Sequence, residues 1–399
     1  MHKLSQALAI AGLIGVPAFA FAETPPAQMP EMPEKPGAAT PGLPFDHTGH
    51  IDIGYTNLSG SGKFINNINN RVFDFDRNAV NIHALDLTFS RLPENGFGGL
   101  VNLTVGRDAD TIAAYGTIDK SRGPAAGVNK KFDVTQAYLH YGSGPFMVIG
   151  GKYVTLAGAE VIKSPSDVNY SRSILFGYAI PFTHTGVRVT YKVNDMVSVT
   201  AGINNGWDDF QDTNGDKTVE LGLSLAPTKT FSLAAQGYSG KEQIANYPSP
   251  PSATKGTRNL IDLVATYAAT DQLSLVLNYD YGSQENAVLI SGASGTAKWD
   301  GWAGYANYQI NEQWRLSLRA ELFNDTDAYR TGAVEPGKTS GQKWKEATLT
   351  VAYLPVKSVE LRAEARADSS DQNVFLDTDG VTPKSSQRSL GLEAIYKFW

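Results

Sequence analysis

The sequence of 399 residues has no cysteine. This absence excludes disulfide bridges, thiolate nucleophiles and cysteine-ligated zinc. Charged residues are also scarce, at 19% of the chain, and no run of lysine and arginine occurs. With a sequence pI of about 5.6, this distribution excludes a basic nucleic-acid surface, so no nucleic-acid partner is expected. Beyond the N-terminal segment there is no run of 18 apolar residues, and therefore no candidate transmembrane helix.

Glycine and tyrosine, by contrast, are abundant, with 39 and 18 residues, and 10% of the chain is aromatic. Disordered chains contain few aromatic residues, so this composition predicts a folded protein. The length fits two or three soluble domains or one large barrel, and does not decide between them.

The first 22 residues predict a secretory signal peptide. Lys3 precedes an apolar stretch of ten residues, and Ala20-Phe21-Ala22 forms a small-x-small cleavage site. A membrane anchor is the alternative, but this stretch is about half of the roughly 20 residues that a helical span needs. Residues 23–45 contain seven prolines, which predicts an extended periplasmic linker. The remaining residues, 46–399, form the main predicted domain.

Apolar and polar residues alternate with a period of two in this domain. In 359–368 the apolar residues alternate with Glu, Arg and Asp, and 314–323 repeats the pattern with Arg, Ser and Glu. Successive side chains of a strand point to opposite faces, so each segment has one apolar and one polar face. A soluble β-sandwich and a membrane β-barrel both produce this alternation.

The alternation predicts sixteen strands whose connections are alternately short and long. Turn-like sequences such as Asn194-Asp195 form the short ones, whereas 107–131, 155–184 and 282–298 all exceed ten residues. Short turns at one rim and long loops at the other are typical of outer-membrane barrels. The predicted strands are 48–57, 80–91, 98–106, 132–141, 146–154, 185–193, 197–205, 218–225, 231–239, 259–267, 273–281, 299–310, 314–324, 343–354, 359–368 and 386–398.

Tyrosine recurs on the apolar face of these strands, just before a short turn or the C-terminus. A ring of tyrosines at one height is typical of a membrane interface, because the ring lies in the apolar boundary and the hydroxyl among the headgroups. A sandwich core has no reason to repeat this placement, so the sequence predicts an all-β, transmembrane antiparallel β-barrel. The predicted girdle comprises Tyr141, Tyr191, Tyr267, Tyr308, Tyr353 and Tyr396.

The last predicted strand presents an apolar row that ends in Phe398. This row resembles the C-terminal assembly signal of outer-membrane proteins and implies recognition by the outer-membrane assembly machinery. The sequence departs from that pattern by one residue, because Trp399 follows.

If the apolar face meets lipid, the polar face lines a lumen, and sixteen strands enclose a water-filled one. Arginines from 314–324 and 359–368, two strands separated by one, would then form a positive ladder that sets ion selectivity. An equally open alternative is that neighbouring Arg and Glu side chains neutralise each other and stiffen the wall. The predicted pore-lining charges are Arg188, Arg315, Arg319, Arg362, Arg366, Glu321, Glu360 and Glu364.

The connection 155–184 is the longest and contains the apolar run Ile174-Leu175-Phe176-Gly177-Tyr178-Ala179-Ile180. Such a run does not suit a solvated loop tip. Folding inward would bury it and narrow the lumen, whereas packing against a neighbouring subunit is the competing explanation. The residues predicted to form the constriction are Glu160, Asp167, Arg172 and Phe176.

Five motifs lie between residues 132 and 208: Asp133-Val134-Thr135-Gln136-Ala137-Tyr138, Asn169-Tyr170-Ser171-Arg172-Ser173, Phe176-Gly177, Ile180-Pro181-Phe182-Thr183-His184-Thr185-Gly186-Val187-Arg188 and Asn204-Asn205-Gly206-Trp207-Asp208. Together they resemble the OmpL-like β-barrel porin family of Gram-negative bacteria. The resemblance implies an outer-membrane porin but supplies no substrate or catalytic residue. The acidic Pro-Glu-Phe motif of the general trimeric porins is absent, so a possible homotrimer follows from the architecture alone.

These observations predict a porin of the cell outer membrane through which small hydrophilic solutes or ions diffuse passively, constricted by 155–184. The expected partners are outer-membrane lipid and lipopolysaccharide, the assembly machinery and the solutes. A structural or adhesion barrel with a closed lumen is the alternative reading, and a membrane-embedded hydrolase is the third.

No catalytic, metal or cofactor site is predicted. The segment 212–216 resembles the start of a calcium loop, but its glycine comes too early and position twelve is Leu223. The six histidines lack metal-ligand spacing, and no Gly-x-Ser-x-Gly elbow accompanies them. The sequence therefore predicts that the protein is not an enzyme.

Overall fold

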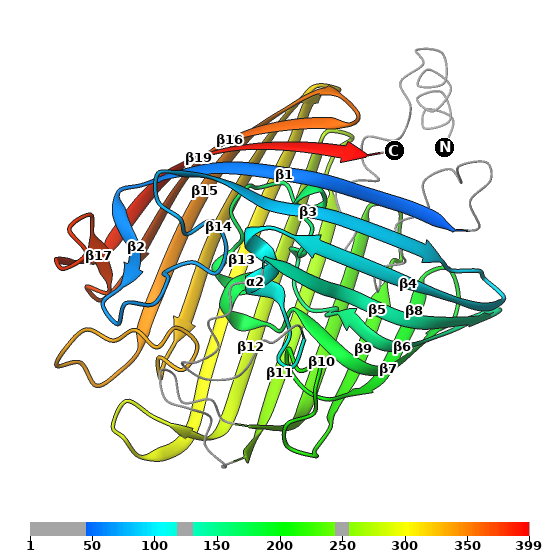
Figure 1. Cartoon of the computed structure of the whole chain (residues 1–399), viewed down its shortest axis with the longest axis horizontal. Helices are drawn as coiled ribbons and strands as arrows, with labels where there is room; N and C mark the ends of the chain where they lie inside the picture. The colour runs from blue at the N-terminus through cyan, green and yellow to red at the C-terminus, as the bar shows by residue number, and fades with distance from the viewer. Residues whose placement is uncertain (1–44, 118–130, 244–254, 399) are drawn as a thin grey trace.

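The computed structural model describes residues 45–117, 131–243 and 255–398. The predicted signal peptide, all but one residue of the predicted linker, and Trp399 lie outside the described residues. The described chain forms one closed barrel of sixteen antiparallel strands (Figure 1). The predicted all-β antiparallel barrel of sixteen strands is therefore confirmed.

Each strand of the barrel pairs with its neighbours along the chain, and the first strand closes on the last. The barrel strands are β1 (Asp46–Leu58), β3 (Ala79–Arg91), β4 (Gly96–Val105), β5 (Phe132–Ser143), β6 (Phe146–Val154), β7 (Thr183–Lys192), β8 (Val197–Asn204), β9 (Thr218–Leu225), β10 (Phe231–Gln243), β11 (Lys255–Ala268), β12 (Leu273–Val288), β13 (Ser294–Asn311), β14 (Trp314–Asp325), β15 (Gln342–Val356), β16 (Val359–Ser370) and β19 (Ser386–Phe398).

Closure of the barrel depends on β1, which pairs with β3 on one side and with β19 on the other. Figure 1 shows β1 in blue beside β19 in red. Ile53 lies opposite Ala394, and Gly49 lies opposite Phe398. Because every strand has two neighbours, no backbone edge is left without hydrogen-bond partners, as a membrane span requires.

The two faces of the wall differ as the alternation predicts, and the polar face is the inner one. On β16, Arg362, Glu364 and Arg366 are buried, whereas Leu361 is 42% exposed. On β14 the outward Leu318 and Leu322 are 49% and 55% exposed. A soluble sandwich would bury its apolar faces, so this arrangement is that of a barrel whose outer face meets lipid.

The connections also follow the prediction, with one exception. Seven short turns lie at one rim, which is periplasmic in outer-membrane barrels. The predicted long loop 282–298 is wrong, because β12 and β13 continue as a ladder and leave only residues 289–293 as a turn. This extension is mainly polar and lacks a clear alternation, so the sequence pattern gives no strand signal there.

Further elements lie inside the barrel and at its long-loop rim. Three short elements pack against the inner face of the wall: the helix α2 (Arg107–Ile112) and two single turns, η1 (Ser164–Ser166) and η2 (Leu175–Ala179). A small sheet of β2 (Gly60–Phe64), β17 (Phe375–Asp377) and β18 (Pro383–Lys384) joins the first loop to the last (Figure 1). No helix among the described residues is long and apolar enough to cross a membrane.

Candidate functional site

The connection between β6 and β7 folds into the lumen. Since β6 ends at Val154 and β7 begins at Thr183, this inserted loop comprises residues 155–182, two residues fewer than predicted. Its polar groups reach strands on different sides of the wall. These contacts are Ala159 N to Asn278 Oδ1 on β12 (3.1 Å), Leu156 N to the Tyr238 hydroxyl on β10 (3.1 Å), Asn169 Nδ2 to Thr350 Oγ1 on β15 (2.7 Å) and the Tyr170 hydroxyl to Thr56 Oγ1 on β1 (2.9 Å).

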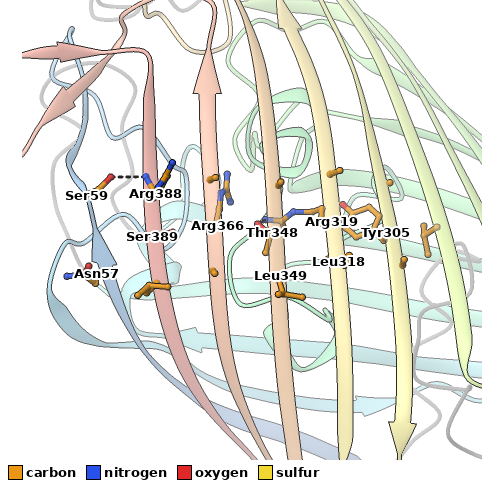
Figure 2. A pocket seen from close by; sticks show the side chains of 18 residues that line it. Asn57, Ser59, Tyr305, Leu318, Arg319, Thr348, Leu349, Arg366, Arg388 and Ser389 are labelled. Atoms are coloured by element: carbon orange, nitrogen blue, oxygen red, sulfur yellow. Dashed lines mark hydrogen bonds between the residues drawn. The ribbon is translucent and has the colours of Figure 1, made fainter.

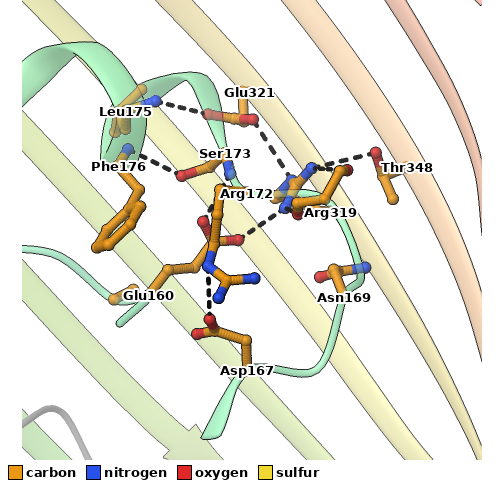
Figure 3. A network of polar contacts seen from close by, with 12 residues as sticks. Glu160, Asp167, Asn169, Arg172, Ser173, Leu175, Phe176, Arg319, Glu321 and Thr348 are labelled. Carbon is orange, nitrogen blue, oxygen red and sulfur yellow. Dashed lines mark hydrogen bonds and ion pairs between the residues drawn. The ribbon is translucent and has the colours of Figure 1, made fainter. Parts of the chain in front are cut away.

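Arg319 on β14 holds the middle of the inserted loop (Figure 3). Its Nη1 donates to Glu160 Oε1 at 2.7 Å and to the Ser171 carbonyl at 2.6 Å. Its Nε lies 3.1 Å from Glu346 Oε2 and 3.4 Å from Glu321 Oε1 on the wall. The guanidinium therefore links loop to wall and is surrounded by carboxylates.

Arg362 on β16 holds residues 164–169 of the same loop. Its Nη2 donates to the carbonyl oxygens of Asp167 (2.6 Å) and Ser164 (3.1 Å). The three remaining N–H groups meet Asn169 O at 3.0 Å, Glu393 Oε2 at 3.0 Å and Glu360 Oε1 at 2.7 Å. Arginine has five N–H donors, and all five of Arg362 are satisfied.

Two predicted wall glutamates accept hydrogen bonds from the loop backbone. Glu321 takes the N–H groups of Ile174 (3.0 Å) and Leu175 (3.1 Å), at the start of η2. Glu364 takes the N–H of Tyr170 at 2.8 Å and that of Ser171 at 3.2 Å. Peptide N–H groups inside a barrel lack helix or sheet partners, and these carboxylates supply them.

The remaining predicted arginines are paired as well. Arg366 donates to the Arg172 carbonyl at 2.6 Å and to Asp368 at 2.8 Å. Arg315 lies 2.5 Å from Glu360 and keeps 15% of its side chain exposed. Arg188, on β7 and apart from the other four, lies 2.5 Å from Glu220 on β9 and stacks on Tyr153 at 4.1 Å.

Arg315, Arg319, Arg362 and Arg366 thus lie on one wall, because β15 alone separates β14 from β16. Each of the four forms an ion pair with at least one wall carboxylate. These distances match the alternative in which neighbouring Arg and Glu side chains neutralise each other. Arg319, Arg362 and Arg366 also contact the inserted loop, which the sequence pattern did not indicate. Their effect on ion selectivity stays a prediction.

The four residues predicted to form the constriction all belong to the inserted loop. Arg172 Nε lies 2.9 Å from Asp167 Oδ2 (Figure 3), and Glu160 bonds to Arg319. Phe176 is 3% exposed and packs on Phe182 at a centroid distance of 5.3 Å, so it lies in an apolar cluster instead of facing an opening.

That cluster accounts for the apolar run of the loop. Leu175 and Ile180 are buried in one cluster with Trp299 on β13 and Trp207 in the connection between β8 and β9, and the Trp299 indole N–H donates to the Ala179 carbonyl at 3.0 Å. The apolar run is therefore covered within a single chain.

A cavity of about 20 Å³ lies next to this cluster, between the inserted loop and the wall of β4 to β6. It is lined by Asn102, Gln136, Lys163 and others. This volume holds about one water molecule.

Tyr170 is a site residue whose wall contacts the sequence did not reveal. Its hydroxyl lies 2.9 Å from His83 Nε2, and its ring lies against Gly391. A Cβ on Gly391 would come within 2.5 Å of the ring, and one on Gly54 within 2.5 Å of the hydroxyl oxygen. Glycine at these two wall positions makes room for the tyrosine.

Arg71 is a second residue that the sequence did not reveal. It lies in the connection between β2 and β3, with Nη1 2.8 Å from Asp74 and Nη2 2.9 Å from Asp368 on β16. No motif marks it, because its partner on the wall lies 297 positions away.

The six predicted girdle tyrosines lie on the outer face near the short-turn rim. Four are 41–48% exposed, and Tyr191 and Tyr353 are half-buried against neighbouring aromatic rings. Tyr353 packs on Trp314 and Tyr191 on Phe146, each with centroids 4.6 Å apart. Their contact with a membrane interface stays a prediction.

In the part of the chain that the structure describes, no group of three or more His, Asp or Glu side chains is arranged to hold a metal ion.

Solved structures with this fold are outer-membrane proteins. The outer membrane channel DcaP of Acinetobacter baumannii superposes with a TM-score of 0.59 at 15% identity, covering 89% of this chain and 97% of that one. The anion-selective porin of Comamonas acidovorans gives 0.59 at 11% identity, with 89% and 99% covered. OmpT of Vibrio cholerae in its trimer form gives 0.58 at 12% identity, with the same coverage.

Sequence comparison identifies the family. A search of curated proteins found no match. The model of the family described as "Putative beta-barrel porin-2, OmpL-like" matches residues 44–398 and so spans the whole barrel. With its sixteen-stranded closed wall and its inserted loop, the chain belongs to the OmpL-like beta-barrel porin-2 family and is a porin of the cell outer membrane.

Proposed function

We propose that the protein lets small hydrophilic solutes or ions diffuse passively through the barrel, with the inserted loop setting the width of the path. The observation that carries this proposal is the attachment of the inserted loop to one side of the wall, inside the lumen, by Arg319, Arg362 and Arg366. A loop held by buried charge-assisted hydrogen bonds keeps one position and so gives a path of defined width. Diffusion of this kind needs no reaction, and we propose that the protein is not an enzyme.

Single-channel conductance in planar bilayers tests the proposal. The wild-type protein is expected to produce discrete open-channel steps, and deletion of residues 170–182 is expected to increase their size, because the deleted segment fills the lumen. A barrel that produces no steps with or without the segment would contradict the proposed function. Conductance steps of equal size from both proteins would show that the constriction lies in another part of the lumen.

A barrel with a closed lumen and a structural or adhesive role is the second candidate. It is favoured by the water-sized cavity beside the loop and by the burial of wall side chains such as Thr200 (6% exposed) and Ser317 (1%). The same recordings separate the two, since a closed barrel gives no steps until residues 170–182 are removed.

We further propose that the protein assembles as a homotrimer. The support is the trimer form of the similarly folded OmpT of Vibrio cholerae. Multi-angle light scattering of the detergent-solubilised protein, corrected for bound detergent, is expected to give three times the mass of one chain. A single-chain mass would contradict the proposal.

A further inference from the structure

The lipid-facing surface of the barrel contains a groove with a floor of small residues. Gly304 on β13, Ala320 on β14, Ala347 on β15 and Ala367 on β16 are successive cross-strand partners. They form one continuous cross-strand row over four neighbouring strands, and none carries a side chain larger than a methyl group. The floor is therefore a continuous depression in a surface otherwise rich in large apolar side chains.

Larger side chains lie beside this floor. The next outward row toward the periplasmic rim contains Leu318 and Leu349 (Figure 2), which are 49% and 41% exposed. Leu390 on β19, which is 63% exposed, lines the groove as well. The groove runs along the floor and these leucines, has a volume of about 950 Å³ and is lined mainly by apolar groups.

Two positive side chains lie beside the groove, one at the end of the floor row and one in the next outward row toward the long-loop rim. Arg388 on β19 is the cross-strand partner of Ala367 and lines the groove (Figure 2). Lys345 on β15 lies opposite Leu322 in the row above the floor. Both residues are exposed, and neither forms a salt bridge with another described residue. An apolar groove with two cations beside it matches a lipid that has a long acyl chain and a phosphate.

We propose that this groove binds lipid A, the phosphorylated glycolipid anchor of lipopolysaccharide, with an acyl chain along the small-residue floor and a phosphate between Arg388 and Lys345. A second copy of the barrel fits the groove less well. Contact with an apolar copy would bury both cations without a partner, and an unpaired buried charge is strongly unfavourable. A lipid phosphate, by contrast, pairs with both cations at the membrane surface, where water is still present. The lipid site does not depend on whether the lumen conducts.

Titration of the full-length, detergent-solubilised protein with hexa-acylated lipid A, followed by native mass spectrometry, tests the site. The double variant R388A/K345A is expected to weaken binding about fivefold for each charge removed. The double variant A320L/A347L is expected to weaken binding as well, because the leucines fill the floor. All four changes are on the lipid-facing surface, where alanine and leucine are both compatible with the fold.

Two matched controls are expected to bind like the wild type. K357A removes a positive charge at the periplasmic rim, and A201L adds a leucine on the exposed outer face of β8. Wild-type affinity in both groove variants would overturn the proposal. So would a loss of oligomer mass in A320L/A347L at unchanged lipid A affinity, since the groove would then be a contact between copies.

Discussion

Arg362 and Asp167 lie 195 positions apart in the chain, and the guanidinium Nη2 of the first donates to the backbone carbonyl of the second at 2.6 Å. This hydrogen bond joins β16 to the inserted loop. Because the acceptor is a backbone oxygen, the contact fixes the path of the loop itself and not merely one of its side chains.

Replacement of Arg362 by alanine is expected to loosen the inserted loop and to destabilise the barrel. The change removes donors from three loop carbonyls and leaves Glu393 buried without its cation. Loss of one partner of a buried ion pair costs about 3–5 kcal/mol. Urea unfolding in lipid vesicles measures the loss, and bilayer recordings are expected to show larger or less steady conductance.

The matched control is R91A, which removes an exposed arginine at the periplasmic rim. It is expected to keep the stability and conductance of the wild type. If R362A also keeps both, Arg362 does not hold the loop.

Gly391 and Tyr170 are expected to be coupled. An alanine at 391 would place its Cβ 2.5 Å from the Tyr170 ring, and overpacking of this kind costs about 1–3 kcal/mol. The double variant G391A/Y170A lacks the tyrosine ring that the added Cβ would meet. We therefore expect this double variant to be no less stable than Y170A alone. A double-mutant cycle of unfolding free energies measures this coupling.

Gly237 supplies the control for this cycle, because the nearest atom to an added Cβ there is the Leu260 carbonyl oxygen at 4.0 Å. G237A is expected to be additive with Y170A. Additive behaviour of G391A as well would show that the ring does not occupy the space above Gly391.

Arg315 is expected to contribute more to ion selectivity than the other three arginines on its wall. It keeps 15% of its side chain exposed, whereas the side chains of Arg319, Arg362 and Arg366 are 0–3% exposed. If Arg315 is replaced, Glu360 keeps its bond to Arg362, so only the water-facing charge is lost. The reversal potential of R315Q in a tenfold KCl gradient is expected to shift toward cation preference. An unchanged potential would mean that the arginines serve only the structure.

The pair of Tyr353 and Trp314 is expected to stabilise the barrel in a membrane. The rings lie 4.6 Å apart at the periplasmic rim, and such pairs contribute about 0.5–1.5 kcal/mol beyond burial of their area. Y353A is expected to lower the unfolding free energy in lipid vesicles, and Y353F to lower it less, because the ring remains. Equal losses in the two variants would assign the effect to the hydroxyl group instead.

The wall of the barrel was predictable because its determinants are local. Strands β6, β9 and β19 begin and end at the predicted residues, since period-two alternation and turn sequences are properties of adjacent residues. The outward tyrosines and inward arginines follow from the same parity. The ladder of β12 and β13 beyond residue 281 gives no such signal, because its residues do not alternate between apolar and polar.

The sequence by itself thus determined the number of strands, their faces and the presence of one long connection with an apolar run. Only the tertiary structure decided that Arg362 meets Asp167, that Tyr170 lies against Gly391, and that Gly304, Ala320, Ala347 and Ala367 form one cross-strand row. Contacts inside a closed barrel depend on the register between strands and on the path of a loop through the lumen. Both are set by pairings between residues tens to hundreds of positions apart, for which a single sequence carries no local signal.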